Sequence, residues 1–304
     1  MARYFFFIVL VLCGALPQVT RAAPLEDAAA ARSEEAAVLD QLDDAAVARL
    51  DLHCLRMAYP QIKGFADDAE GRWLLLKDGR RVLYAAPLAA DAAALGLALA
   101  DPDADALWDV DVRSSMAEPY PLEPDRPETP LGVSPGRRRS YALLRALYGE
   151  NQAAVRAGLQ AARFLGQGLQ LAAPAARALR DVDARLALAV RQTPALRPLL
   201  KMDGGFTWRR IAGTSRLSPH AFGIALDISP GIATYWRWSP LRPHPLQKGY
   251  PSAIVAAFED AGFIWGGKWH EYDLMHFEYR PELVCKARVL RGVCKVLPPD
   301  GNGF

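Results

Sequence analysis

Residues 218–228 read SPHAFGIALDI and place a histidine and an aspartate seven positions apart in an otherwise apolar run. In a straight strand, positions seven apart lie on opposite faces, so His220 and Asp227 converge only if the chain turns between them. Pro219 and Gly223 supply that irregularity, and the run IALDI predicts a buried strand. A carboxylate inside such a strand is costly unless a cation meets it. Asp227 therefore needs a positively charged partner.

A second stretch, DLMHFEYR at residues 273–280, supplies another histidine. As a strand it places His276 and Glu278 on one face. Two histidines and one carboxylate around an open position form the ligand set of many catalytic zinc sites. Asp273 is then placed to act as general base on the attacking water. From spacing alone, core histidines hydrogen-bonded to nearby acids explain the same pattern, and both interpretations stay open at this point.

Length and charge limit the class of protein. The chain has 304 residues, enough for one large or two small domains. Its 36 basic residues nearly balance 34 acidic ones. No basic patch stands out, so we expect no nucleic-acid partner.

The N-terminus predicts export. It reads MARYFFFIVLVLCGALPQVTRAA, an apolar stretch followed by small residues. The stretch is short for a membrane span and typical of a secretory signal peptide over residues 1–22, with cleavage after Ala22 or Ala23. An uncleaved membrane anchor is the alternative. We expect a periplasmic or extracellular protein.

Three cysteines remain after cleavage of the signal peptide, and an oxidising compartment would permit one disulfide between two of them. Cys285 and Cys294 enclose KARVLRGV, a span short enough to close with Gly292 in a turn. We predict this pair, which leaves Cys54 as a free, buried thiol that behaves as a small hydrophobic residue.

The rest of the chain reads as supporting structure. Residues 25–50 have the composition of a surface helix or a lead-in to the fold. Two β-prone runs flank Asp78-Gly79, which predicts a hairpin. Residues 101–139 are rich in proline and acid, and they form either a linker or a loop that wraps the catalytic body. Residues 140–200 have a helical pattern, including one helix that begins at the cap Asn151 and ends at Gly166.

Two blocks of the sequence together resemble a known family. SRLSPHAFGIALDI resembles the SxHxxGxAxD pattern of the D-alanyl-D-alanine carboxypeptidase-like, VanY-type zinc peptidases, which also include L-alanyl-D-glutamate endopeptidases. GFIWGGKWHEYDLMHFEYRPEL resembles the second block of that family, which ends in (D/E)xxH. The blocks cover residues 205–283, and weaker similarity reaches back past residue 135.

The resemblance implies a fold and a set of roles. His220, Asp227 and His276 would hold Zn²⁺, and Asp273 would be the catalytic base. The implied fold is α+β, a small antiparallel sheet with flanking helices that carries a zinc cleft, as in hedgehog and DD-peptidase folds. A mixed hairpin and helical region would precede it.

One feature departs from the family pattern. Several members have a cleft arginine after a tyrosine upstream of the first block, and no such pair precedes His220 here. Arg209 and Arg216 are the candidate substitutes for binding a substrate carboxylate or polarising the scissile carbonyl, with structural salt bridges as the alternative. Trp269 is a candidate wall of the substrate cleft. Glu278 is expected to contact the metal ligands without binding the metal itself.

The implied zinc site and the expected export together predict hydrolysis of amide bonds in peptidoglycan stem peptides. The enzyme would be a D-Ala-D-Ala carboxypeptidase or an L-Ala-D-Glu endopeptidase. In the family that the chain resembles, carboxypeptidases commonly carry glutamate at the position of Asp273 and endopeptidases often aspartate, so the resemblance favours the endopeptidase. The alternative is a noncatalytic zinc-containing module for cell-wall binding or signalling. We expect a monomer without an organic cofactor. The predicted division is a signal peptide (1–22), an N-terminal region (23–135), a zinc peptidase domain (136–297) with its catalytic core at 205–283, and a tail (298–304).

Overall fold

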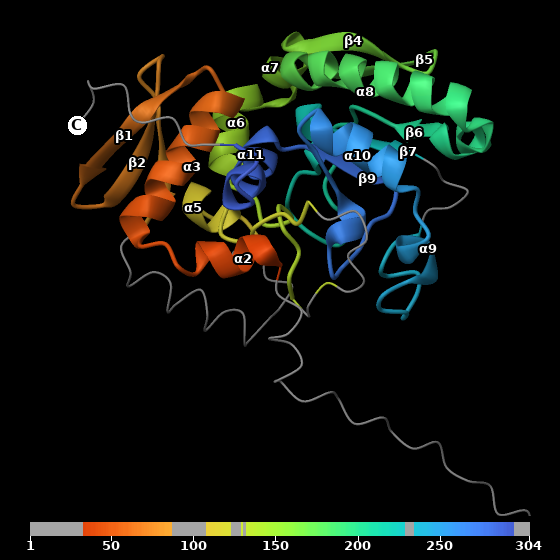
Figure 1. Cartoon of the computed structure of the whole chain (residues 1–304). Helices are drawn as coiled ribbons and strands as arrows, with labels where there is room; N and C mark the ends of the chain where they lie inside the picture. Colours follow the sequence, from red (N-terminus) through yellow and green to blue (C-terminus); the bar gives the residue numbers. More distant parts are fainter. Residues whose placement is uncertain (1–32, 87–107, 123–128, 130–131, 229–233, 295–304) are drawn as a thin grey trace, which may run out of the picture.

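The computed structural model describes residues 33–86, 108–122, 129, 132–228 and 234–294 (Figure 1). Within these ranges the chain is α+β, as predicted, with helices packed around three antiparallel sheets. The predicted signal peptide and the tail lie outside the described residues. None of the helices in these ranges is long and apolar enough to cross a membrane.

A three-stranded sheet dominates the N-terminal region and lies at one end of the molecule (Figure 1). The predicted hairpin is confirmed, with Gly79 in the turn at φ 89°, and one further strand precedes it. The helix over residues 44–58 begins where the Asp43 carboxylate accepts the backbone N–H of Ala46 at 2.6 Å. The elements are α2 (Glu34–Leu39), α3 (Asp44–Ala58), β1 (Ile62–Asp68), β2 (Gly71–Leu76), β3 (Arg81–Ala85) and α5 (Val112–Ser115).

The middle of the chain is only partly helical. Asn151 caps its helix as predicted, but that helix ends at Ala157, so the longer helix expected there is wrong. Ala162 and Phe164 are buried while Arg163 between them is exposed, which is the alternation of a strand. A turn at Leu165 and Gly166, both with positive φ, closes a hairpin. The elements are α6 (Tyr141–Tyr148), α7 (Gln152–Ala157), β4 (Leu159–Phe164), β5 (Gln167–Ala172), α8 (Ala173–Gln192) and η2 (Pro194–Leu200).

The C-terminal part forms a four-stranded sheet of order β6-β7-β9-β8. Leu226 and Phe277 pair across two of its strands and enter the main core, together with Leu179 of α8 and Phe258 of the helix over residues 252–260. This leaves the other face of the sheet for polar side chains. The elements are β6 (Met202–Gly204), η3 (Pro219–Phe222), β7 (Ala225–Ile228), α9 (Pro245–Lys248), α10 (Ser252–Asp260), β8 (Phe263–Trp265), η4 (Gly266–Lys268), β9 (His276–Tyr279) and α11 (Pro281–Leu290).

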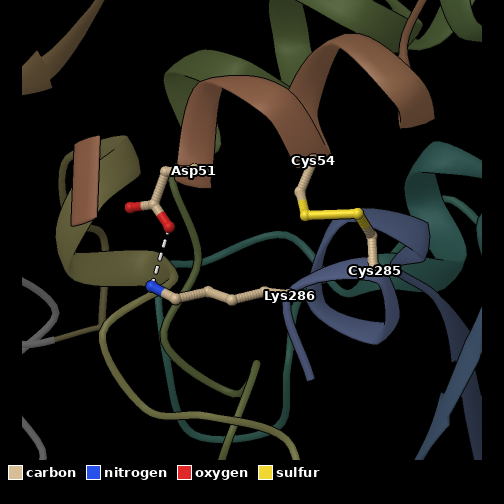
Figure 2. The surroundings of a disulfide bond; sticks show 4 residues. All are labelled: Asp51, Cys54, Cys285 and Lys286. Atoms are coloured by element: carbon tan, nitrogen blue, oxygen red, sulfur yellow. Dashed lines mark ion pairs between the residues drawn. A yellow bond between two sulfur atoms is a disulfide. The ribbon is translucent and has the colours of Figure 1, made fainter. Parts of the chain in front are cut away.

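The N-terminal region shares a core with the C-terminal part. Leu55 of α3 lies in the same buried cluster as Leu283 and Val284 of α11, and the two helices lie side by side in Figure 1. Figure 2 shows the Lys286 ammonium beside the Asp51 carboxylate, and these buried groups are 2.7 Å apart. The predicted domain division stays a prediction.

The disulfide prediction is wrong. Cys54 of α3 bonds to Cys285 of α11, with their Cα atoms 5.5 Å apart (Figure 2), and Cys294 is a free, exposed thiol. Cys285 lies within α11, which packs against α3, and this contact brings Cys285 to Cys54. Proximity in the sequence alone therefore indicated the wrong partner.

The described part of the proline-rich segment packs on the catalytic body. The Trp269 indole N–H donates to the Pro135 carbonyl at 2.7 Å, and the Lys268 ammonium donates to the Pro121 carbonyl at 2.7 Å. Tyr120 donates its hydroxyl to Glu259. Of the two alternatives for this segment, the wrapping loop is the one that the described residues adopt.

Candidate metal centre

The first histidine is positioned by a tight turn. His220 lies in η3, where the Ser218 hydroxyl accepts the His220 backbone N–H at 3.4 Å. The turn ends at Gly223 with φ 68°. A Cβ atom there would come within 2.6 Å of a Leu159 methyl group and within 2.8 Å of the Ala172 backbone nitrogen, so this position requires glycine on both grounds. The irregularity predicted from Pro219 and Gly223 is confirmed.

The other two candidate ligands face each other across the sheet. Asp227 of β7 and His276 of β9 are directly paired in the antiparallel register. Paired residues project to the same face, with Cβ atoms about 4.5–5.5 Å apart. Glu278 lies two residues further along β9 and shares this face. The turn before β7 brings His220 over the same spot, and the rings of the two histidines have centroids 5.2 Å apart.

Hydrogen bonding defines the tautomer of His220. Its Nδ1 lies 2.8 Å from the Gly205 carbonyl oxygen. Because a carbonyl only accepts, Nδ1 carries the proton, and Nε2 of the neutral ring presents a lone pair. That Nε2 is buried and makes no hydrogen bond with the described residues, although Asp227 Oδ2 is 3.2 Å away.

His276 is oriented in the complementary way. Its Nε2 lies 3.3 Å from Glu278 Oε2 and its Nδ1 lies 3.1 Å from Asp227 Oδ1. Glu278 is fully buried and is held by the Arg139 guanidinium, with Arg139 Nη2 at 2.5 Å from Oε2 and Nε at 2.9 Å from Oε1. Burial would raise the pKa of Glu278, but Arg139 holds it well below the usual range. A charged Glu278 thus accepts the Nε2 proton and leaves Nδ1 for a cation.

The donor set fits a metal ion. The ligand atoms of His220, Asp227 and His276 all lie within 4.8 Å of one another. His220 Nε2 lies 3.2 Å from Asp227 Oδ2 and His276 Nδ1 lies 3.1 Å from Asp227 Oδ1, so both histidine nitrogens face the same carboxylate. Without a metal, the facing nitrogen and oxygen lone pairs of these residues repel one another unless a proton lies between them. Burial opposes the charged form of His276, yet its hydrogen bonds to Asp227 and Glu278 raise its pKa to about 9.

Asp273 lines the same cleft as the three ligands. Its Oδ1 is buried and has no hydrogen-bond partner within the described part of the chain. The backbone fixes the residue, because Asp273 N–H donates to the Gly266 carbonyl at 3.0 Å. Burial raises the pKa of Asp273 and outweighs the attraction of His276. A carboxylate of this kind accepts a proton more readily than a solvated one.

The other predicted site residues lie around the cleft, whose volume is about 280 Å³. Arg209 and Arg216 both line it, and the Arg216 guanidinium stacks over Trp108 at 5.3 Å. Trp269 is only 3% exposed and packs against the His276 ring at 5.6 Å. It forms part of the floor behind the metal ligands, with little surface left for a substrate.

Two further arginines of the cleft escaped sequence reasoning. Arg137 and Arg139 line it, and both come from the proline-rich segment, in which the sequence analysis named no site residue. Arg137 lies 3.1 Å from Glu271 and stacks over Trp108 at 4.7 Å. The signal was available in the run GRRR at residues 136–139. A buried Glu278 requires a cation, and this run holds the partner.

Comparison with known proteins agrees with this geometry. Residues 212–279, which carry all three candidate ligands and Asp273, match a family described as D-alanyl-D-alanine carboxypeptidase. The resemblance inferred from the two sequence blocks is confirmed over this segment. Neither the curated proteins nor the solved structures gave a match.

Proposed function

We propose that this chain, whose residues 212–279 belong to the D-alanyl-D-alanine carboxypeptidase family, is a zinc-dependent hydrolase of amide bonds in peptidoglycan stem peptides. The observation that carries the proposal is the convergence of three ligand atoms within 4.8 Å, beside the Asp273 carboxylate, whose buried Oδ1 has no hydrogen-bond partner among the described residues. Such a set suits the three-ligand, open-position arrangement of catalytic zinc.

His220, Asp227 and His276 would hold the ion, His220 through Nε2 and His276 through Nδ1. Zinc bound there would supply a Lewis acid that polarises the scissile carbonyl and activates a water molecule. Glu278 and Arg139 fix the orientation of the His276 ring, which keeps Nδ1 directed at the site.

Asp273 would take the proton from the attacking water and pass it to the leaving amine. Its raised pKa supports this role, because a general base works best when its pKa lies near the working pH. The cleft arginines would bind a substrate carboxylate or the carbonyl oxygen as negative charge develops on it.

The substrate follows from the family and from the expected export. A peptidase outside the cytoplasmic membrane, with a cleft of about 280 Å³, meets the short peptides of the cell wall as its abundant target. The fold around the site would be the hedgehog and DD-peptidase type. Asp273, in place of glutamate, favours cleavage between L-Ala and D-Glu.

Mass spectrometry of muropeptides incubated with the zinc-loaded protein tests this proposal. Release of the peptide stem from L-Ala identifies an endopeptidase, and loss of a terminal D-Ala identifies a carboxypeptidase. If no amide bond is cleaved by protein that carries zinc, the hydrolase proposal is wrong, and a noncatalytic binding module becomes the better account.

A further inference from the structure

A second hollow adjoins the candidate active site. It has a volume of about 660 Å³, and Arg209 and Arg216 line both it and the cleft. The wall between the two is a loop over residues 209–218. Backbone hydrogen bonds close this loop, from Ser218 N–H to Arg209 O at 3.0 Å and from Ile211 N–H to Arg216 O at 2.9 Å. The hollow and the cleft therefore lie on either side of this loop, which its backbone hydrogen bonds hold in place.

The hollow carries an excess of positive charge. Its charged lining consists of one carboxylate, Asp109, and four arginines: Arg145, Arg209, Arg210 and Arg216. An arginine guanidinium stays protonated at any physiological pH and pairs with a carboxylate through two parallel hydrogen bonds. Trp208 adds an aromatic wall, which suits the aliphatic part of a peptide residue. The lining thus matches an organic anion better than a neutral or cationic group.

The arginines divide into two kinds. Arg210 Nη1 donates to the Ser215 carbonyl at 2.5 Å, and Arg216 stacks over Trp108, so these two stabilise the loop. The guanidinium groups of Arg145 and Arg209 make no hydrogen bond or ion pair with the residues that the structure describes. Arg145 is half-buried on α6, a rigid element, and lines the hollow without lining the cleft. It is placed to bind an anion, and its effect is separable from the catalytic site.

We infer that this hollow is an anion subsite that binds a carboxylate-bearing residue of the substrate peptide. The inference rests on the proposed function and extends it. It predicts that the protein distinguishes stem peptides by a carboxylate that takes no part in the chemistry. A peptide in which that carboxylate is a carboxamide loses the charge-assisted hydrogen bonds to Arg145 and Arg209.

The test uses two synthetic stem pentapeptides that differ at one group. In one, the internal glutamyl residue has a free α-carboxylate, and in the other it has a carboxamide. Titration calorimetry gives Kd for each peptide with the zinc-loaded protein. We expect the carboxylate peptide to bind about tenfold more tightly, the size of a hydrogen bond to a charged group. Arg145→Gln should clearly reduce this preference, because Arg209 alone is then left to bind the carboxylate, and the loss should appear in Kd and KM.

Arg163→Gln is the matched control, because Arg163 is exposed on β4 away from both hollows, and it should keep the full preference. Arg145→Met, which preserves the aliphatic stem, replaces Arg145→Gln if circular dichroism shows that the latter is misfolded. Equal affinity of the two peptides for the wild type overturns the inference, as does a preference that is undiminished in the Arg145 variant. A preference that depends on Arg145, with neither peptide cleaved, supports the subsite and counts against the hydrolase proposal alone.

Discussion

Loss of the Cys54–Cys285 disulfide should destabilise the fold strongly. The bond links residues 231 positions apart. In the chain-entropy treatment, a closed loop of this length lowers the entropy of the unfolded chain by an amount worth about 5.5 kcal/mol at 25 °C. Measured losses for native disulfides are usually about 2–5 kcal/mol. We expect the double variant Cys54→Ala, Cys285→Ala to lose free energy of unfolding in the upper part of that range.

The same treatment predicts a smaller stabilisation for the disulfide that sequence proximity suggests. Cys285 and Cys294 are nine residues apart, and a bond between them would contribute only about 2.6 kcal/mol. With that pairing, Cys54→Ala would leave the disulfide intact. In the observed pairing, Cys294→Ala is the neutral change, since that thiol is free and exposed.

Urea unfolding followed by circular dichroism measures these differences. The oxidised wild type, the double variant and Cys294→Ala are compared, each in the metal-free state so that zinc binding does not contribute. A large loss for the double variant with no loss for Cys294→Ala supports the structure. The reasoning is refuted if Cys294→Ala is as destabilising as the double variant, or if the double variant unfolds at the wild-type urea concentration.

Three further predictions concern the site. Asp273→Ala should keep one zinc per chain, by elemental analysis, and lower turnover about 10²–10⁴-fold, because the residue is proposed to move a proton and not to bind the ion; loss of the zinc would contradict this. Glu278→Gln should weaken zinc about 10–100-fold in competition with a chromophoric chelator, since a neutral amide holds the His276 proton less firmly; unchanged affinity would count against the orienting role. Zinc affinity should also rise with pH. The metal-free pKa of His276 is about 9, so below that pH zinc must displace a proton, and affinity should increase about tenfold per pH unit from pH 7 to 8.5 and level off above pH 9. A flat profile across this window would contradict the prediction that zinc displaces a proton from His276.

The candidate site was largely predictable because its determinants are local. Pro219 and Gly223 mark the turn that brings His220 over the strand, and the two-residue period of a strand puts His276 and Glu278 on one face. Resemblance to a peptidase family supplied the grouping of these two blocks, which spacing alone left open. The direct pairing of Asp227 with His276 depends on the register of the two strands, which the sequence analysis did not predict.

The parts that sequence reasoning missed depend on distant contacts. Nothing near Cys54 indicates a partner 231 residues away, and the run GRRR at residues 136–139 offers cations without indicating which of them pairs with Glu278. The hairpin β4–β5 was mistaken for helix because its residues include Ala161 and Ala162, which favour helices. Burial of Phe164 against Phe258, with ring centroids 6.0 Å apart, outweighs that local preference.

The most direct test of the central claim is a titration of metal-free protein with zinc, in which bound metal and muropeptide hydrolysis are measured in the same samples. If His220, Asp227 and His276 form one catalytic site, hydrolysis rises in proportion to zinc and reaches its maximum at one equivalent, and His276→Ala shows neither the binding nor the rise. Hydrolysis that persists at full strength after zinc is removed, or its absence when one equivalent is bound, would contradict the account.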